Sequence, residues 1–164
     1  MNMAIHKLDL GEFDEVDYFL IAIHTSLEDY RLAYFINQKL PINLSKSTEE
    51  VQINIKEGET NFARFYYYDF ENAVSWNLIQ NKNEVLQQKT NPSQDLFAAI
   101  SMEISTKVFL LPEFKKADYF LKIENIDDTI DVSQIKTTLN TIDSISAVYT
   151  VDTNLIKSKN NLIF

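Results

Sequence analysis

One nine-residue pattern occurs twice in the chain, and it constrains the fold more than any other feature of the sequence. Glu12-Phe13-x-x-x-Asp17-Tyr18-Phe19-Leu20 aligns with Glu113-Phe114-x-x-x-Asp118-Tyr119-Phe120-Leu121, at a constant offset of 101 residues (113 − 12). Six of the nine positions are identical. A short apolar segment precedes each copy, and a capped amphipathic helix is predicted after each. We therefore expect an internal duplication of a β-turn-β-α-β unit, over about residues 4–55 and 105–151.

The residues around each copy predict the elements of these units. Residues 4–10 alternate enough to form a short strand, and Val16–Ile23 is apolar almost throughout, which is typical of a strand buried on both faces. Thr25-Ser26-Leu27-Glu28 predicts the start of a helix, with a hydroxyl cap and Glu28 placed for a capping box. In the second unit, Asp131 is predicted to start a helix in the same way, and residues 144–151 to form the strand after it.

Between the units, three β-prone segments predict a meander: residues 51–55, 61–70 and 72–80. Residues 81–95 are polar, rich in Asn and Gln and interrupted by Pro92, which favours a long loop. Together the elements predict a single α+β domain over residues 1–164, with a mostly antiparallel sheet and two helices on one face. The strand–helix–strand from Asp118 to Val151 is expected to pair two parallel strands through a right-handed crossover. In part, then, the fold would be ferredoxin-like or ACT-like.

The composition excludes several kinds of site. With two glycines, the chain cannot carry a dinucleotide-binding glycine pattern, and without cysteine it has no disulfide, thiolate metal site or cysteine nucleophile. Two histidines, His6 and His24, have no triad-like partners in the sequence, and no acidic segment fits a calcium loop. We therefore expect no metal, no cofactor and no enzymatic activity.

The charge and the apolar pattern bear on partners and location. The net charge of −9 comes from 15 basic and 24 acidic residues, and no basic face is apparent, so nucleic-acid binding is not expected. No apolar run approaches the 18 or so residues that span a membrane, and the N-terminus lacks the basic and apolar regions of a secretory signal. We expect a cytoplasmic protein that does not enter membranes.

The second copy also carries a family resemblance. Leu111-Pro112-Glu113, three residues, then Ala117-Asp118-Tyr119 is similar to the signature of the bacterial IPExxxVDY family. Pro112, Glu113, Asp118 and Tyr119 match that signature, and Leu111 and Ala117 are apolar replacements for its isoleucine and valine. The family has no assigned activity, so the resemblance implies a bacterial, cytoplasmic protein and no catalytic residues.

The four matching residues, Pro112, Glu113, Asp118 and Tyr119, are candidate binding residues. If the duplication places Asp17 and Asp118 side by side on neighbouring strands, the two carboxylates could raise one pKa or hold a metal. Alternatively, each aspartate starts a strand and accepts hydrogen bonds from turn amides. The second interpretation is favoured.

The most unusual composition lies at residues 65–70, Phe-Tyr-Tyr-Tyr-Asp-Phe, together with Trp76. Alternation along a strand places Tyr66, Tyr68 and Phe70 on one face and Phe65, Tyr67 and Asp69 on the other. One face can lie under the helices, and the other then needs a partner or a second layer of the same domain. Tyr66, Tyr68 and Trp76 are therefore candidate binding residues.

These observations predict a non-enzymatic interaction or scaffold module that binds a protein partner, or a second copy of itself, through an aromatic strand surface. A small-molecule-sensing, ACT-like regulatory domain is the alternative. An enzyme that uses Asp17, Glu113 and Asp118 would need these carboxylates to converge in one pocket.

Overall fold

The computed structural model describes residues 17–56, 58–89, 102–127 and 130–164. The predicted strand at residues 4–10, and Glu12 and Phe13 of the first copy, lie outside the described residues. The described elements are, in chain order, β1 (Tyr18–Thr25), α2 (Asp29–Lys39), β2 (Ser45–Lys46), β3 (Val51–Ile55), β4 (Gly58–Phe62), β5 (Arg64–Asp69), β6 (Val74–Gln80), β7 (Lys82–Lys89), β8 (Met102–Phe109), the 3-10 helix η1 (Pro112–Phe114), β9 (Tyr119–Glu124), α3 (Val132–Leu139), β10 (Ile145–Thr150), and the 3-10 helices η2 (Thr153–Leu155) and η3 (Lys159–Leu162).

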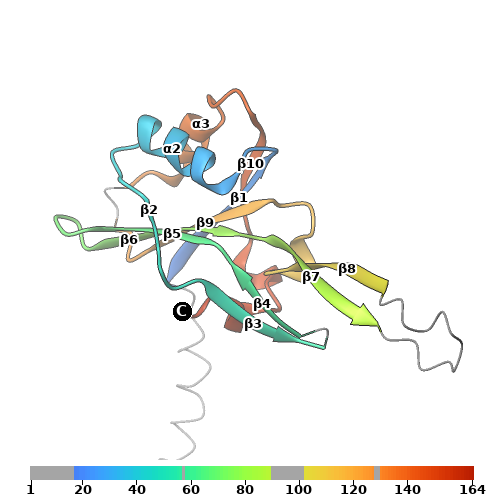
Figure 1. The fold of residues 1–164 in the computed structure, drawn as a ribbon. Coiled ribbons are helices and arrows are strands. Elements are labelled where there is room, and N and C mark those ends of the chain that lie inside the picture. Colours follow the sequence, from blue (N-terminus) through green and yellow to red (C-terminus); the bar gives the residue numbers. More distant parts are fainter. Residues whose placement is uncertain (1–16, 57, 90–101, 128–129) are drawn as a thin grey trace, which may run out of the picture.

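A six-stranded sheet forms the centre of the molecule, in the order β10-β1-β9-β6-β5-β2. Every neighbouring pair in it is antiparallel. Helices α2 and α3 pack on the same face of this sheet (Figure 1). The predicted α+β class, with a mostly antiparallel sheet and two helices on one face, is confirmed.

The sheet is buried on both sides, because its central strands carry apolar residues at successive positions. On the helix side, Ile21, Ile23 and Leu121 join the residues of α2 and α3 in one core. On the other side, Leu20 and Phe120 pack with residues of the β3–β4 hairpin, the segment after β8 and the last residues of the chain. The apolar run that predicted a strand buried on both faces is thus β1.

The connection from β9 through α3 to β10 differs from the prediction. β1 pairs with both β9 and β10, so these two strands are parallel to each other but separated by β1. The expectation that they pair directly was wrong. The sequence pattern of the second repeat unit cannot show that β1, from the distant N-terminal region, lies between β9 and β10. The ferredoxin-like comparison and the duplication stay predictions.

Two hairpins lie outside the central sheet. Among the described strands, β3 pairs only with β4, in a separate two-stranded sheet, so residues 51–55 do not join a three-stranded meander with β5 and β6. Gly58 begins β4 with a φ of +130°, a backbone conformation that glycine adopts readily. β7 pairs along its whole length with β8, so the loop predicted from residue 81 onward is a strand as far as Lys89.

The two helix starts differ. Asp131 caps α3, and its Oδ1 accepts hydrogen bonds from Ser133 N (2.9 Å) and Gln134 N (3.3 Å), as predicted. In α2 the N-cap is Glu28, with no side-chain cap, so the predicted capping box is wrong. The Thr25 hydroxyl accepts from Leu27 N (3.1 Å) and donates to Ser144 O (2.7 Å), so it ties β1 to the start of β10.

Candidate functional site

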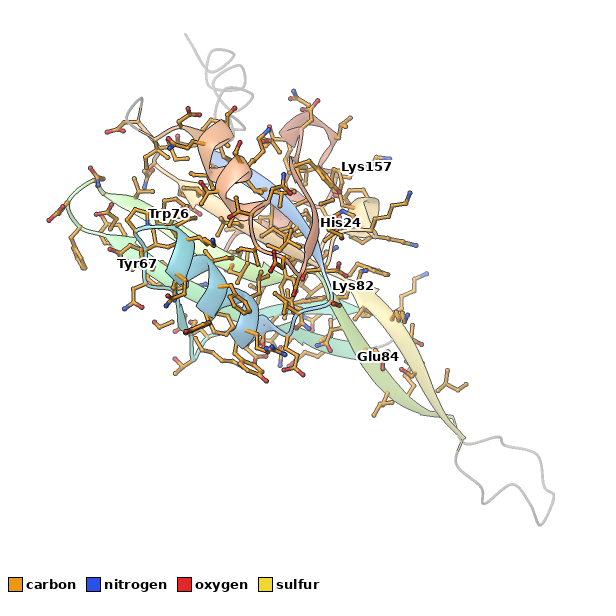
Figure 2. All side chains as sticks on the ribbon, turned by 90° about the horizontal axis from the view of Figure 1, so that it is seen from above. His24, Tyr67, Trp76, Lys82, Glu84 and Lys157 are labelled. Carbon is orange, nitrogen blue, oxygen red and sulfur yellow. The ribbon has the colours of Figure 1, made fainter. Side chains whose placement is uncertain are left out.

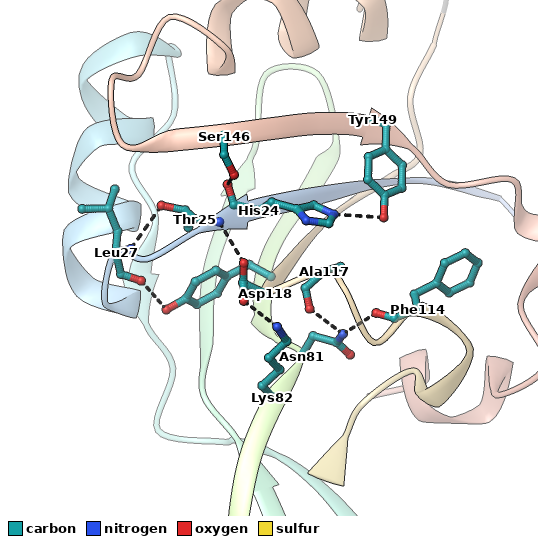
Figure 3. Close-up of polar contacts among 11 residues, drawn as sticks. His24, Thr25, Leu27, Asn81, Lys82, Phe114, Ala117, Asp118, Ser146 and Tyr149 are labelled. Carbon is teal, nitrogen blue, oxygen red and sulfur yellow. Dashed lines mark hydrogen bonds and ion pairs between the residues drawn. The ribbon is translucent and has the colours of Figure 1, made fainter. Parts of the chain in front are cut away.

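Residues 111–119, which carry the family-like signature, connect β8 to β9 and are called the joint below. Asn81, between β6 and β7, organises the joint from a fully buried position. Its side-chain amide donates to Phe114 O (2.9 Å) and Ala117 O (2.8 Å) (Figure 3). Its Oδ1 accepts from Leu111 N (2.9 Å). One asparagine therefore satisfies three backbone groups of the joint.

Asp118 lies at the start of β9 and connects two other strands. Its Oδ2 accepts from Thr25 N (2.9 Å) in β1, and its Oδ1 accepts from Lys82 Nζ (2.8 Å) in β7 (Figure 3). Both carboxylate oxygens have partners within the chain. This arrangement matches the interpretation in which the aspartate begins a strand and binds amides.

Glu113 holds the C-terminal segment against the joint. Its Oε1 accepts from Lys157 N and Ser158 N (both 2.8 Å), and its Oε2 accepts from the Ser158 hydroxyl (3.1 Å). Partial burial acts to raise the pKa of Glu113, but these hydrogen bonds outweigh it and hold the pKa below its usual value. Pro112, at the exposed start of η1, supplies the fixed φ that suits the first turn of a helix.

Tyr119 faces the helix-side core and is 7% exposed. Its hydroxyl donates to Leu27 O (2.8 Å), just before α2. Burial, with the nearby charges of Asp29, Asp118 and Glu28, raises the pKa of Tyr119 to about 12. The four signature residues thus have structural roles in the joint: they connect β8, β9, the start of α2 and the C-terminal segment.

The described strands of the two copies, β1 and β9, pair with each other. The pairing is antiparallel, with Tyr18 opposite Glu124 and Ile23 opposite Tyr119. Asp17 is therefore at one end of the strand pair and Asp118 at the other. The hypothesis of a carboxylate pair or shared metal site at these two residues is wrong, because antiparallel pairing separates them.

The aromatic strand is β5, and the alternation predicted for it is confirmed. Phe65 is buried, and Tyr67 packs against the helix-side core. Tyr66 and Tyr68 are half-buried on the opposite face, and Phe70 is 87% exposed. The rings of Tyr68 and Phe70 are in edge contact, 4.7 Å between centroids. We call Tyr66, Tyr68 and Phe70 the aromatic surface.

Trp76 does not belong to this surface. It lies opposite Tyr67 in the β5–β6 pair, on the helix side, and is 5% exposed. The prediction that Trp76 acts together with Tyr66 and Tyr68 was wrong. The sequence marked Trp76 as unusual, but only the register between β5 and β6 shows which face it occupies.

The outer edge of β5 is largely uncovered. Among the described residues, β2 pairs with β5 at Ser45–Tyr66 and Lys46–Phe65, Ser47 N donates to Arg64 O (2.9 Å), and the sheet ends at β2. Gln80 N donates to Ala63 O (3.0 Å), so in this register the odd-numbered residues of β5 bond to β6 and the even-numbered residues face outward. Tyr68 therefore directs its backbone N–H and C=O toward an edge that no described strand covers. The β5–β6 hairpin extends past β2 at the left of Figure 1.

A shallow hollow of about 500 Å³ lies beside this edge, lined by Pro41 and residues 67–72. The turn that forms one wall is held by Asp69, whose carboxylate accepts from Glu71 N (3.0 Å), Asn72 N (3.2 Å) and Asn72 Nδ2 (2.7 Å). These bonds lower the pKa of Asp69, with the Asn72 side chain as the largest cause. The open edge, the aromatic surface and the hollow together form the candidate interaction surface.

Several buried polar side chains were not anticipated from the sequence, and two of them make contacts that hold distant segments together. Asn81 is one, and Lys122, 5% exposed in the middle of β9, is the other. Lys122 Nζ donates to Leu162 O (2.7 Å), pairs with Glu124, and lies 4.7 Å from the ring centroid of Phe164. A lysine inside the apolar run Leu121-Lys122-Ile123 is the signal that could have indicated an internal partner.

His24, a weak candidate for chemistry, lies near the joint. Its Nε2 is 3.1 Å from the hydroxyl of Tyr149 in β10 (Figure 3). Among the described residues, no three His, Asp or Glu side chains gather as they would around a metal ion. No helix in the described part of the chain combines the length and apolar character that crossing a membrane requires.

Comparison with known proteins gives no match to any family model, curated protein or solved structure. The resemblance of the joint to the IPExxxVDY signature therefore stays a prediction from the motif.

Proposed function

We propose that this chain is a non-enzymatic interaction module, and that a partner protein adds an extended segment to the open edge of β5. The observation that carries the proposal is the uncovered edge at Tyr68, bordered by the aromatic surface. An extended segment would bond to the outward N–H and C=O of Tyr68, and its side chains would contact Tyr68 and Phe70. Aromatic residues beside an open edge supply large contact area at low conformational cost.

Charge favours a different protein over a second copy of the chain. Each copy carries a net charge of −9, so two copies repel each other at low salt. Nucleic acid is a poor fit, because stacked bases come with a basic groove, and Arg64 is the one basic residue of β5. Arg64 is also already engaged: its Nε donates to Asn77 Oδ1 (2.8 Å), and it lies over the rings of Tyr66 and Phe164.

The non-enzymatic part of the proposal is supported by the joint. Glu113 and Asp118 accept hydrogen bonds from within the chain at every carboxylate oxygen. Asp17 lies at the far end of the β1–β9 pair, so the three carboxylates do not converge in one pocket, as shared chemistry would require.

A photo-crosslinking amino acid placed at position 70 tests the proposal in cells. The matched control places the same group at position 30, because Tyr30 on α2 is also exposed, at 60%. We expect a defined adduct from position 70 and none of the same mass from position 30. An adduct of twice the chain mass would identify a second copy, contrary to the charge argument. Equal adducts from both positions, or none from position 70, would contradict the proposal.

Two substitutions at one residue separate the strand edge from the aromatic ring. Tyr68→Val keeps the outward N–H and removes the ring, whereas Tyr68→Pro removes both and leaves the bonds to β6 in place. We expect Tyr68→Val to weaken partner binding about 10-fold, and Tyr68→Pro to abolish the adduct from position 70. An adduct that persists in Tyr68→Pro, with the variant folded by circular dichroism, would exclude strand addition at this edge.

A further inference from the structure

A second hollow lies on the helix side of the sheet, between the end of α2 and the start of α3. Its volume is about 350 Å³, within the range of small-molecule sites. Leu40, Pro41 and Ile42 form the wall after α2, and Ile130 and Ile135 form the wall at α3. Trp76 contributes from the sheet, and seen from the helix side it lies between the two helices (Figure 2).

Trp76, which lines this hollow, also carries an unpaired polar group. It is 5% exposed, and its indole N–H is buried without a hydrogen-bond partner. It is the one buried side-chain donor or acceptor among the described residues to lack a partner. Leaving such a donor unpaired costs about 1–3 kcal/mol, so a folded chain seldom keeps one without a reason.

The charges around the hollow limit what it can take. Asp69 and Asp131 both line it, and Lys39 is the basic residue at its rim. The carboxylates already accept hydrogen bonds from neighbouring groups, Asn72 and Ser133 among them, so neither needs a cation. The net negative surroundings oppose an anion. The apolar walls and the unpaired donor suit an uncharged molecule with one acceptor.

We infer that this hollow is a binding site for a small, uncharged organic molecule with a carbonyl-type oxygen, and that the side chains around the hollow shift on binding so that this oxygen reaches the indole N–H of Trp76, which is covered in the free chain. The apolar body of the molecule packs between Ile42, Ile130 and Ile135. This hollow shares Pro41, Asp69 and Asn72 with the hollow beside the β5 edge, so the two sites are neighbours. The inference rests on Trp76, Ile130 and Ile135, which line only the hollow on the helix side.

The chain suits a direct test, because Trp76 is its one tryptophan. The two-dimensional ¹H–¹⁵N correlation spectrum of the full chain contains one tryptophan indole N–H resonance, which reports on this donor alone. Cyclohexanone is the probe, with cyclohexylammonium and cyclohexanecarboxylate as charged controls of similar size. We expect the indole proton to shift downfield saturably with cyclohexanone. The two charged probes should move it at least 10-fold less at equal concentration.

Two variants test whether the indole shift and the rise in melting temperature come from binding in this hollow. Thr138→Leu fills the hollow from α3 while Trp76 remains, and should abolish the indole shift with the rest of the spectrum preserved. Trp76→Phe removes the donor, and should abolish the rise in melting temperature that cyclohexanone gives the unaltered chain. An indole resonance that does not move up to the solubility limit would overturn the inference. So would equal shifts from all three probes, or a shift that survives Thr138→Leu.

Discussion

In the joint, the polar groups of the signature residues are satisfied from within the chain, whereas at the outer edge of β5 a backbone donor and acceptor face outward without a described partner. Glu113 and Asp118 together accept five hydrogen bonds from the chain's own backbone and side chains. Tyr68 and Phe70 contact each other and leave their strand edge open. The region that is most conspicuous in the sequence therefore makes contacts within the chain, and the region proposed to bind a partner is marked in the sequence only by its aromatic content.

Substitutions in the joint should therefore lower the free energy of unfolding. Substitutions at the β5 edge should instead weaken partner binding, with little effect on the free energy of unfolding.

The largest effect on stability is expected from Asn81→Ala. The substitution leaves the carbonyl of Ala117 and the N–H of Leu111 buried without their partner, and removes one of the two donors to Phe114 O. We expect a loss of about 4 kcal/mol in the free energy of unfolding, measured by urea denaturation. Asn83→Ala in β7 is the matched control. The Asn83 side chain also bonds backbone groups, Asn61 O and Glu84 N, but water can reach and replace these exposed bonds, so the substitution should cost less than about 1 kcal/mol. Equal losses at the two positions would remove the special role of Asn81.

A smaller loss is expected from Tyr119→Phe, which removes the hydrogen bond to Leu27 O. We expect about 1–1.5 kcal/mol at pH 8. Because the folded-state pKa of about 12 lies above the ordinary value of 10.0, this tyrosine adds stability that is fully present below pH 10 and declines as pH rises toward 12. Urea curves between pH 8 and 11.5 should show that Tyr119→Phe loses less stability over this window than the unaltered chain. Parallel declines would contradict the raised pKa.

Glu113→Gln should cost about 1 kcal/mol at pH 7, since the carboxylate is only partly screened from water. Its folded-state pKa lies below the ordinary value of 4.5, so its contribution is present above pH 4.5 and is lost as pH falls through the folded value. The difference in stability between the variant and the unaltered chain should therefore shrink below pH 4.5. A difference that stays constant down to pH 3 would show that charge on Glu113 does not matter.

The smallest effect on stability is expected from Phe70→Ser, below about 0.5 kcal/mol, because the ring is 87% exposed. Partner binding, followed by pull-down against the unaltered chain, should nevertheless weaken at least 10-fold. Glu113→Gln serves as the opposite control, with lower stability and unchanged binding. If Phe70→Ser destabilises the chain as much as Asn81→Ala, the distinction between the two regions fails.

The local sequence pattern was sufficient to predict those elements whose form depends on residues close together in the sequence. The apolar run of β1 predicted burial on both faces, Asp131 predicted the start of α3, and alternation predicted which side chains of β5 share a face. In each case the physical cause is within a few residues of the effect. The burial of Trp76 could not be predicted in this way, because it depends on the register between β5 and β6.

Pairing over long distances was not predictable for the same reason. The polar residues of β7 read as a loop, because nothing near them shows that β8 will pair with them, and strand formation depends on such neighbours. The parallel strands β9 and β10 were expected to pair directly, because the sequence does not show that β1 lies between them. At the site, the joint's four signature residues were found from sequence, but Asn81, which organises them, looked like part of a polar loop.

The position of β1 between β9 and β10 has a consequence for the order in which the chain can fold. Its bond partners lie far along the chain: Thr25 binds Asp118 across 93 residues and Ser144 across 119. During synthesis, this strand emerges long before either neighbour exists, with apolar side chains on both faces and both edges unpaired. Topologies dominated by such distant pairings fold slowly. Until β9 and β10 have been synthesised, a chaperone or an aggregating chain can bind the exposed β1 segment. This exposure ends only when β10 is available to pair with it.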